Sequence, residues 1–366
     1  MSIKHVISFS GGKDSTATLL IALGRCQRED IIPIFCDTGN EHVAVHEYLS
    51  YLEQALDITI VRLKADFTQE IAAKRVFIAR DQRTRREYDI EPVFEMDGKT
   101  PVPKRDGRGN IVMHKVKRNG VMVEEPKQKT RKIGSGRRVR WTNSAKRRAL
   151  SALHPTGNPF LDLCMWKGRF PSRKAQFCTE ELKRNVAVAF QLDLIDAGYQ
   201  VISWQGVRRD ESLNRRDAKK MERSGKSLWV FRPIVDWSAA QVFAFCAQQK
   251  IQPNPLYKQG MHRVGCMPCI NAGKDELREI VARFPVYLEE KSRWEARVSQ
   301  TAKRGFSTFF CKELHDNNMA DRRVYEANRV ESVIEWTRTT RGGRQFDLLA
   351  GTTEPTACAS AYGLCE

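Results

Sequence analysis

Residues 8–15 read Ser-Phe-Ser-Gly-Gly-Lys-Asp-Ser, and this stretch decides the fold. An apolar, strand-like run, Val6–Phe9, leads into it, and a helix-like run, Ala17–Leu23, follows it. Two glycines let the backbone turn tightly and approach an anion closely. The first N–H groups of a helix have no partners within the helix, so the stretch predicts phosphate binding at a helix N-terminus. The predicted contacts are Ser10, Gly11, Gly12, Lys13, Asp14 and Ser15.

The loop differs from a Walker A motif, which has Gly, four further residues and then Gly-Lys-Ser/Thr. Ile7 stands where the first glycine would be, and Asp14 follows Lys13. An ordinary Gly turn capped by serine is the alternative interpretation. The position of the whole string between a strand-like and a helix-like run favours the phosphate loop.

A second apolar run, Ile31–Asp37, follows the first helix-like run and ends in Cys36-Asp37-Thr38-Gly39. The order strand, loop, helix, strand is typical of a doubly wound parallel sheet that binds its ligand beyond the carboxyl ends of the strands. We therefore predict an α/β fold of this kind, with a basic insertion and a helical C-terminal part.

Positive charge is concentrated in one part of the 366-residue chain. The net charge is +18, and residues 74–148 hold 23 Lys and Arg against 9 Asp and Glu. This excess indicates a polyanion partner, and nucleic acid is the one we expect; a solvated basic face without a ligand is the alternative. No apolar run is long enough to span a membrane, and the N-terminus enters a strand directly, so we expect a cytoplasmic protein.

Composition divides the chain into four predicted parts. Residues 1–80 form the first part of the nucleotide-binding domain, 81–150 a basic insertion rich in hairpins or partly disordered, 151–275 the second part, and 276–366 a helical region with a loose tail. Apolar spacing predicts helices over Glu47–Leu56, Phe67–Ala79, Glu180–Ala197, Trp237–Lys250 and Asp275–Ser299.

Cysteines form the second chemical pattern. Cys266 and Cys269 belong to a Cys-Met-Pro-Cys motif, and Cys164 and Cys178 lie upstream. A Cys-x-x-Cys pair can ligate one metal or cluster, with further ligands from distant sequence. Three interpretations stay open: a [4Fe-4S] cluster held by these four residues, a structural Zn²⁺ with the same ligands, or a redox dithiol or buried thiols.

The loop Ser10–Ser15 resembles the PP-loop of the adenine nucleotide α-hydrolase superfamily, whose members cleave ATP between the α- and β-phosphates. In its phosphoadenylyl-sulfate (PAPS) reductase branch a strand ending in Asp-Thr-Gly lies near the nucleotide, which implies this role for Asp37, Thr38 and Gly39. Phe177-Cys178-Thr179 is similar to a segment that carries a Cys-Cys pair in cluster-containing reductases. This chain has a single cysteine there, which puts a cluster of that type in doubt.

A cationic loop extends the resemblance. Gly206-Val207-Arg208-Arg209 follows the strand-like run Val201–Trp204, and Arg215 comes soon after. Guanidinium groups match phosphate oxygens, and the reductases have a similar series beside their nucleotide. The resemblance therefore implies nucleotide contacts from Gly206, Arg208, Arg209 and Arg215. It covers about residues 1–73 and 158–275.

Three functions compete. The first is an ATP pyrophosphatase, similar to those of DNA phosphorothioation, that uses ATP and Mg²⁺ to adenylate an acceptor; Lys13, Asp14 and Arg208 would carry catalysis, with partners in a modification or defence system. The second is a PAPS reductase whose nucleophile is a tail cysteine, Cys365 or Cys358. The third is a non-catalytic nucleic-acid-binding accessory. We favour the first, because it gives the basic insertion a purpose.

Overall fold

The computed structural model describes residues 2–82, 86–118, 121–138, 141–311, 321–339 and 364. The chain forms two compact units, one of residues 1–75 and 147–366 and the other of residues 76–146. None of the described helices is long and apolar enough to cross a membrane.

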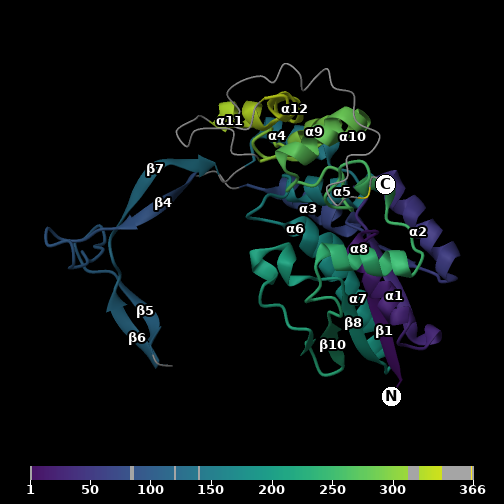
Figure 1. Ribbon diagram of the computed structural model, residues 1–366. Coiled ribbons are helices and arrows are strands. Elements are labelled where there is room, and N and C mark those ends of the chain that lie inside the picture. Colours follow the sequence, from purple (N-terminus) through teal and green to yellow (C-terminus); the bar gives the residue numbers. More distant parts are fainter. Residues whose placement is uncertain are drawn as a thin grey trace. The chain divides into compact units, whose positions relative to one another are not determined.

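A six-stranded sheet forms the centre of the first unit, in the order β3-β2-β1-β8-β10-β9 (Figure 1). All neighbouring pairs are parallel except β10 and β9. The strands are β1 (Ile3–Phe9), β2 (Ile31–Asp37), β3 (Val61–Lys64), β8 (Gln200–Gln205), β9 (Met221–Arg223) and β10 (Leu228–Phe231). The predicted α/β fold with a mainly parallel sheet is confirmed.

Helices connect these strands because the apolar segments between them have helical spacing. α1 (Lys13–Leu23) follows β1, α2 (Val43–Leu56) follows β2, and α7 (Asn185–Asp196) precedes β8. Val6, Ile34 and Val201, one from each of three adjacent strands, form a buried core cluster on which α7 packs. The remaining helices of this region are α3 (Thr68–Arg80), α4 (Asn143–Ala152), α5 (Pro159–Lys167), α6 (Phe177–Thr179) and α8 (Ala239–Gln248).

Two predicted helices differ in detail from those observed. The helix predicted over Asp275–Ser299 is two helices, α9 (Lys274–Arg283) and α10 (Pro285–Thr301). Pro285 causes the division, because proline lacks the N–H that a helix interior needs but is tolerated in a first helical turn. The helix predicted over Glu180–Ala197 begins as a π-helical turn, Glu180–Arg184, before α7. α11 (Asp321–Asn328) and α12 (Val330–Thr337) follow.

The second unit is built from antiparallel ribbons. β4 (Arg86–Pro92) pairs with β7 (Thr130–Arg138), and β5 (Met113–Arg118) pairs with β6 (Val121–Pro126). Figure 1 shows these pairs as two separate ribbons. Large apolar side chains are exposed on this unit, among them Ile90, Met96 and Met122. Such two-stranded ribbons bury little surface of their own.

Candidate functional site

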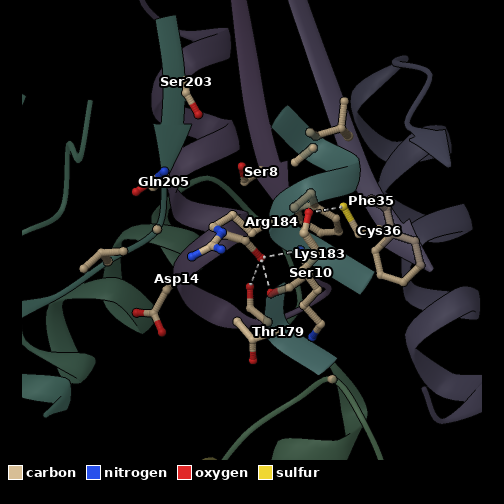
Figure 2. Close-up of a pocket in the computed structure, with 18 of the residues that line it drawn as sticks. Ser8, Ser10, Asp14, Phe35, Cys36, Thr179, Lys183, Arg184, Ser203 and Gln205 are labelled. Atoms are coloured by element: carbon tan, nitrogen blue, oxygen red, sulfur yellow. Dashed lines mark hydrogen bonds between the residues drawn. The ribbon is translucent and has the colours of Figure 1, made fainter. Parts of the chain in front are cut away.

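A cavity of about 650 Å³ lies in the first unit, beside the carboxyl ends of β1, β2 and β8. Its volume is in the range of small-molecule and cofactor sites. Figure 2 shows side chains from several segments that line it, including Ser10, Asp14 and Lys183. The predicted nucleotide contacts that line it are Ser10, Gly12, Lys13, Asp14, Ser15, Gly206 and Arg215.

The phosphate loop has the geometry expected of a helix N-terminus. Gly11 has φ +76°, which is strained for any other residue, and a Cβ there would meet Val45 at 2.9 Å. The Ser15 hydroxyl donates to the Gly12 carbonyl at 2.9 Å and lies 3.2 Å from the Ser10 amide nitrogen, which donates to it. Ser15 therefore holds the loop closed around its own backbone.

Tyr257 takes one of the N–H groups at the start of α1. Its hydroxyl oxygen accepts from the Lys13 amide at 3.0 Å, and the Lys13 ammonium lies 5.4 Å from the centre of its ring. The tyrosine belongs to a one-turn helix, Pro255–Tyr257, far along the chain. It thus occupies a donor that an anion bound at this helix terminus would use. The sequence pattern gave no sign of this contact.

Arg208 is almost completely buried and is paired with the loop. Its Nε lies 2.5 Å from the Asp14 carboxylate, and its Nη1 contacts Asp210. Burial alone would lower the pKa of Arg208, but the two carboxylates raise it. Asp14 lines the cavity and Arg208 does not, so Arg208 contacts the cavity wall through Asp14.

Several predicted nucleotide contacts do not line the cavity. Arg209 is exposed and pairs with Asp236. Asp37 accepts from the Gly39 amide at 2.9 Å, and the Thr38 hydroxyl donates to Glu41 at 2.7 Å. Glu41 lines the cavity and the predicted Asp37 does not, although the Glu41 carboxylate also accepts hydrogen bonds from this turn.

The charge of the cavity suits a polyanion that carries a cation. Its wall contains five basic residues and three acidic ones, which are Lys13, Lys183, Arg184, Arg215, Arg263, Asp14, Glu41 and Glu211. Lys183, Arg184 and Arg263 also line the cavity, and the sequence did not single them out as nucleotide contacts, although Lys183 and Arg184 lie in the helix predicted over Glu180–Ala197. Basic side chains in a concave wall strengthen the attraction for phosphate.

The four predicted cysteine ligands come from three segments that meet beside this wall. Cys164 lies on α5 and is fully buried, Cys178 lies on α6, and Cys266 and Cys269 precede α9. The Cys266 loop is fixed to the turn after β2, because the Met267 amide donates to the Asn40 carbonyl at 2.7 Å. Cys266 Sγ lies 3.7 Å from Glu41 Oε1, so this loop contacts a residue that lines the cavity.

Electrostatic coupling connects these thiols. Burial raises the pKa of Cys164, Cys178 and Cys266, and that of Cys266 reaches about 12. Neighbouring thiols raise these pKa values further. Cys178 raises the pKa of Cys164, and Cys269 raises the pKa of Cys178 and of Cys266. Cys266 in turn is the main cause of the raised pKa of Lys183. In the part of the chain that the structure describes, no three or more His, Cys, Asp or Glu side chains form a group that could hold a metal ion.

Of the other described cysteines, Cys36 is partly buried and Cys246 is buried. Burial raises the pKa of Cys36 to about 11 and of Cys246 to about 12, so neither is a ready thiolate. Cys36 nevertheless lines the cavity, and its thiol donates to the Lys183 carbonyl at 3.6 Å (Figure 2). The predicted tail nucleophiles Cys358 and Cys365 lie outside the described residues.

Three known sequences show the range of similarity. The chain is 41% identical to the uncharacterized 37.8 kDa protein in the gpa 5′ region of Escherichia phage 186, over 99% of this chain and 96% of that protein. An uncharacterized protein of Methanocaldococcus jannaschii is 30% identical over 37% of this chain and 27% of its own length. Adenosine 5′-phosphosulfate reductase of Neisseria meningitidis serogroup B is 35% identical, but over only 19% of this chain and 30% of its own length.

Among solved structures, the phosphoadenylyl-sulfate reductase of Candida auris matches 73% of this chain and 81% of its own, with 12% identity and a TM-score of 0.35. That resemblance is too weak to carry an argument. The family model for the phosphoadenosine phosphosulfate reductase domain matches residues 4–100 and 111–272, which include the phosphate loop, the cavity wall and the Cys-x-x-Cys motif. This chain is therefore a member of the phosphoadenosine phosphosulfate reductase domain family.

Proposed function

We propose that this protein is an ATP pyrophosphatase that cleaves ATP between its α- and β-phosphates and adenylates an acceptor, with nucleic acid as the source of that acceptor. The observation that carries the proposal is the phosphate loop at the N-terminus of α1, which opens into a cavity large enough for a nucleotide. Loop amides and the Lys13 ammonium would present donors to the polyphosphate, while the Ser15 hydroxyl donates within the loop to the Gly12 carbonyl.

Each loop residue has a role in this proposal. The Lys13 ammonium and the loop amides offset the charge that develops on the departing pyrophosphate. Arg215, on the cavity wall, adds a second cation. Arg208 keeps the Asp14 carboxylate in place, as their 2.5 Å contact implies. An acceptor oxygen would attack the α-phosphorus, forming a bond to AMP while the bond to pyrophosphate breaks.

Mg²⁺ is expected with the polyphosphate, since carboxylate and phosphate oxygens are its preferred ligands. Three carboxylates line the cavity, Asp14, Glu41 and Glu211. We favour Asp14, because the Glu41 carboxylate accepts from the Thr38 and Asn40 amides and Glu211 pairs with Arg215. When bound, the ion would neutralise charge between the β- and γ-phosphates. Asp37 does not line the cavity, and its carboxylate accepts from the Gly39 amide.

The four cysteines have the donor chemistry of a thiolate-ligated group, although no three of the described side chains are grouped closely enough to hold a metal ion in this structure. A [4Fe-4S] cluster is our first choice and Zn²⁺ the alternative; the ligands would be Cys164, Cys178, Cys266 and Cys269. Such a group would fix the Cys266 loop, and through Glu41 the cavity wall. Anaerobic purification with metal and sulfide analysis tests this. Iron and sulfide that are lost in Cys266→Ser support the cluster, whereas one zinc in colourless protein favours the alternative.

The first experiment measures pyrophosphate release from ATP, alone and with duplex DNA, single-stranded DNA or tRNA. Release should depend on one nucleic acid and fall at least a hundredfold in Lys13→Ala, because the loop would lose its only lysine at the phosphate. Lys258→Ala, an exposed lysine next to Tyr257, is the matched control and should be active. An absence of release with every nucleic acid would contradict the proposal.

The basic second unit would hold the nucleic acid. Lys104, Lys127 and Lys129 are exposed and lie together, because the Lys104 amide donates to the Lys127 carbonyl at 2.7 Å and the Lys129 amide to the Val102 carbonyl at 2.7 Å. Each phosphate contact contributes about 0.9 to the slope of log affinity against log salt concentration. Changing all three to Gln should therefore lower that slope by about 2–3.

A matched control variant removes the same number of positive charges from exposed lysines outside this unit, by changing Lys64, Lys250 and Lys258 to Gln. It should leave most of the slope intact. Equal effects of the two variants would show that the contact is diffuse attraction to net charge.

Sulfonucleotide reduction is the second candidate, favoured by the short match to adenosine 5′-phosphosulfate reductase. It predicts sulfite release from PAPS or adenosine 5′-phosphosulfate that is abolished in Cys365→Ser. Pyrophosphate release from ATP that persists in Cys365→Ser would separate the two candidates in favour of the first.

A further inference from the structure

The most deeply buried side chain of α7 is polar. The helix reads Asn-Val-Ala-Val-Ala-Phe-Gln-Leu-Asp-Leu-Ile-Asp, yet its one buried residue is Gln191, which is 4% exposed. Val188 and Leu192, its apolar neighbours along the helix, are exposed. Burying a carboxamide costs free energy unless its donors and acceptor are paired. The placement of glutamine at this position therefore needs a partner that recovers the cost.

Ser203 provides one hydrogen-bond partner for the Gln191 carboxamide. Gln191 Nε2 donates to Ser203 Oγ at 3.0 Å, and both residues line the cavity. Ser203 lies on β8, and Figure 2 shows its side chain on the cavity wall. The described residues provide no hydrogen bond to the Gln191 Oε1. Ser203 engages one of the two N–H groups of the amide, so Gln191 keeps its second N–H and, in Oε1, an acceptor for a ligand.

The surroundings of this acceptor suit a flat, apolar ring. Apolar residues of the cavity wall include Ile34, Phe35, Ala187, Val188, Leu228 and Val230. Ser203 precedes Gly206 at the phosphate loop by three residues, which places it roughly 10 Å back along β8 at the usual rise per residue. That separation is on the scale of a nucleoside whose phosphate sits at the loop.

We propose that Gln191, oriented by Ser203, selects the purine base by accepting a hydrogen bond from the 6-amino group of adenine. The inference rests on the proposed nucleotide site and assigns its base specificity to one side chain. A 6-oxo purine presents an acceptor at the same position, so it would face the Gln191 oxygen without a proton between them. Rejection then arises from a buried polar pair left unsatisfied.

The test compares ATP with inosine triphosphate, which differs from ATP at the 6-position substituent and at the N1 proton. Calorimetric titration should show wild-type protein binding ATP about tenfold or more tightly than inosine triphosphate. Gln191→Met keeps the length and the unbranched shape but removes the acceptor. It should weaken ATP binding and reduce the difference between the two ligands to within about threefold.

Two further variants complete the design. Gln248→Met, on the exposed side of α8, makes the same chemical change away from the cavity and should keep wild-type discrimination. Ser203→Ala leaves Gln191 in place but frees its amide to rotate, so the preference for ATP over inosine triphosphate should fall partway. If Gln191→Met fails to fold, Ser203→Ala serves as the test in its place.

The outcomes separate this inference from the proposed function. Wild-type protein that binds ATP and inosine triphosphate equally, or discrimination that survives both Gln191→Met and Ser203→Ala, overturns the role of Gln191 while the nucleotide site stands. Wild-type protein that binds neither ligand overturns both.

Discussion

Replacing Gly206 with alanine tests how β8 meets the phosphate loop. A Cβ on Gly206 would lie 2.8 Å from the carbonyl carbon and oxygen of Asp14 and 2.9 Å from the Ser15 nitrogen. These are backbone atoms, so no side-chain rotation relieves the contact. An ordinary contact begins near 3.4 Å, and the start of α1 would therefore have to move by about 0.6 Å.

Overpacking of this kind destabilises a fold by about 1–3 kcal/mol. We expect Gly206→Ala to lower the free energy of unfolding by that amount in a urea titration, with the slope unchanged. The same shift displaces the loop amides that would bind phosphate, so ATP affinity measured by calorimetry should fall about tenfold or more.

Gly24→Ala is the matched control. Gly24 ends α1 with φ −83° and ψ −8°, and a Cβ there would make only ordinary contacts, the nearest at 3.6 Å. It should be neutral or slightly stabilising, because alanine reduces the freedom of the unfolded chain. If Gly206→Ala is as stable as Gly24→Ala and binds ATP as well, the close packing of β8 on the loop is wrong.

Three further predictions follow from described contacts. Tyr257→Phe removes the hydroxyl that accepts from the Lys13 amide, so a bound phosphate would no longer have to displace it. ATP affinity measured by calorimetry should therefore rise several-fold. An unchanged affinity would mean that phosphate does not use this amide. Arg208→Ala leaves the partly buried Asp14 carboxylate without the Arg208 guanidinium that pairs with it. The free energy of unfolding, measured in urea, should fall by about 3 kcal/mol. A loss below about 1 kcal/mol would contradict a buried ion pair. Burial raises the pKa of Glu295 to about 7, so the folded state binds this proton more tightly than the unfolded state does. The free energy of unfolding should therefore fall as pH rises from about 4.5 to 7, on the order of 1 kcal/mol per pH unit. Urea unfolding of Glu295→Gln across this range should show a flatter pH dependence.

The sequence predicts those parts of the fold that depend on local patterns. The strand-like run before Ser10 and the helix-like run after Ser15 appear as β1 and α1, and the helix predicted over Trp237–Lys250 appears as α8 with Ser238 as its N-cap. Pro285 marks the break between α9 and α10 in the sequence. The apolar spacing continues across this proline, which is why a single helix was predicted.

The candidate site was predictable only in part, because its wall is assembled by contacts between distant segments. Tyr257 reaches Lys13 across 244 residues, and no periodicity encodes that approach. Glu41 replaces Asp37 at the cavity because the turn folds back on itself through side-chain hydrogen bonds. Gln191 was hidden by an apolar helix pattern in which a single polar residue reads as solvent-exposed.

The pairing of β1 with β8 has a consequence for synthesis of the chain. Strands β1, β2 and β3 emerge from the ribosome first, but one edge of β1 has no partner until Gln205 has been translated, after the whole second unit. At about 5–20 residues per second this interval lasts roughly 10–40 s. During it a buried strand of the finished protein is an open edge, the kind of surface that aggregates. Slow translation or a holding chaperone should therefore govern the yield of native protein more than the stability of the completed fold does.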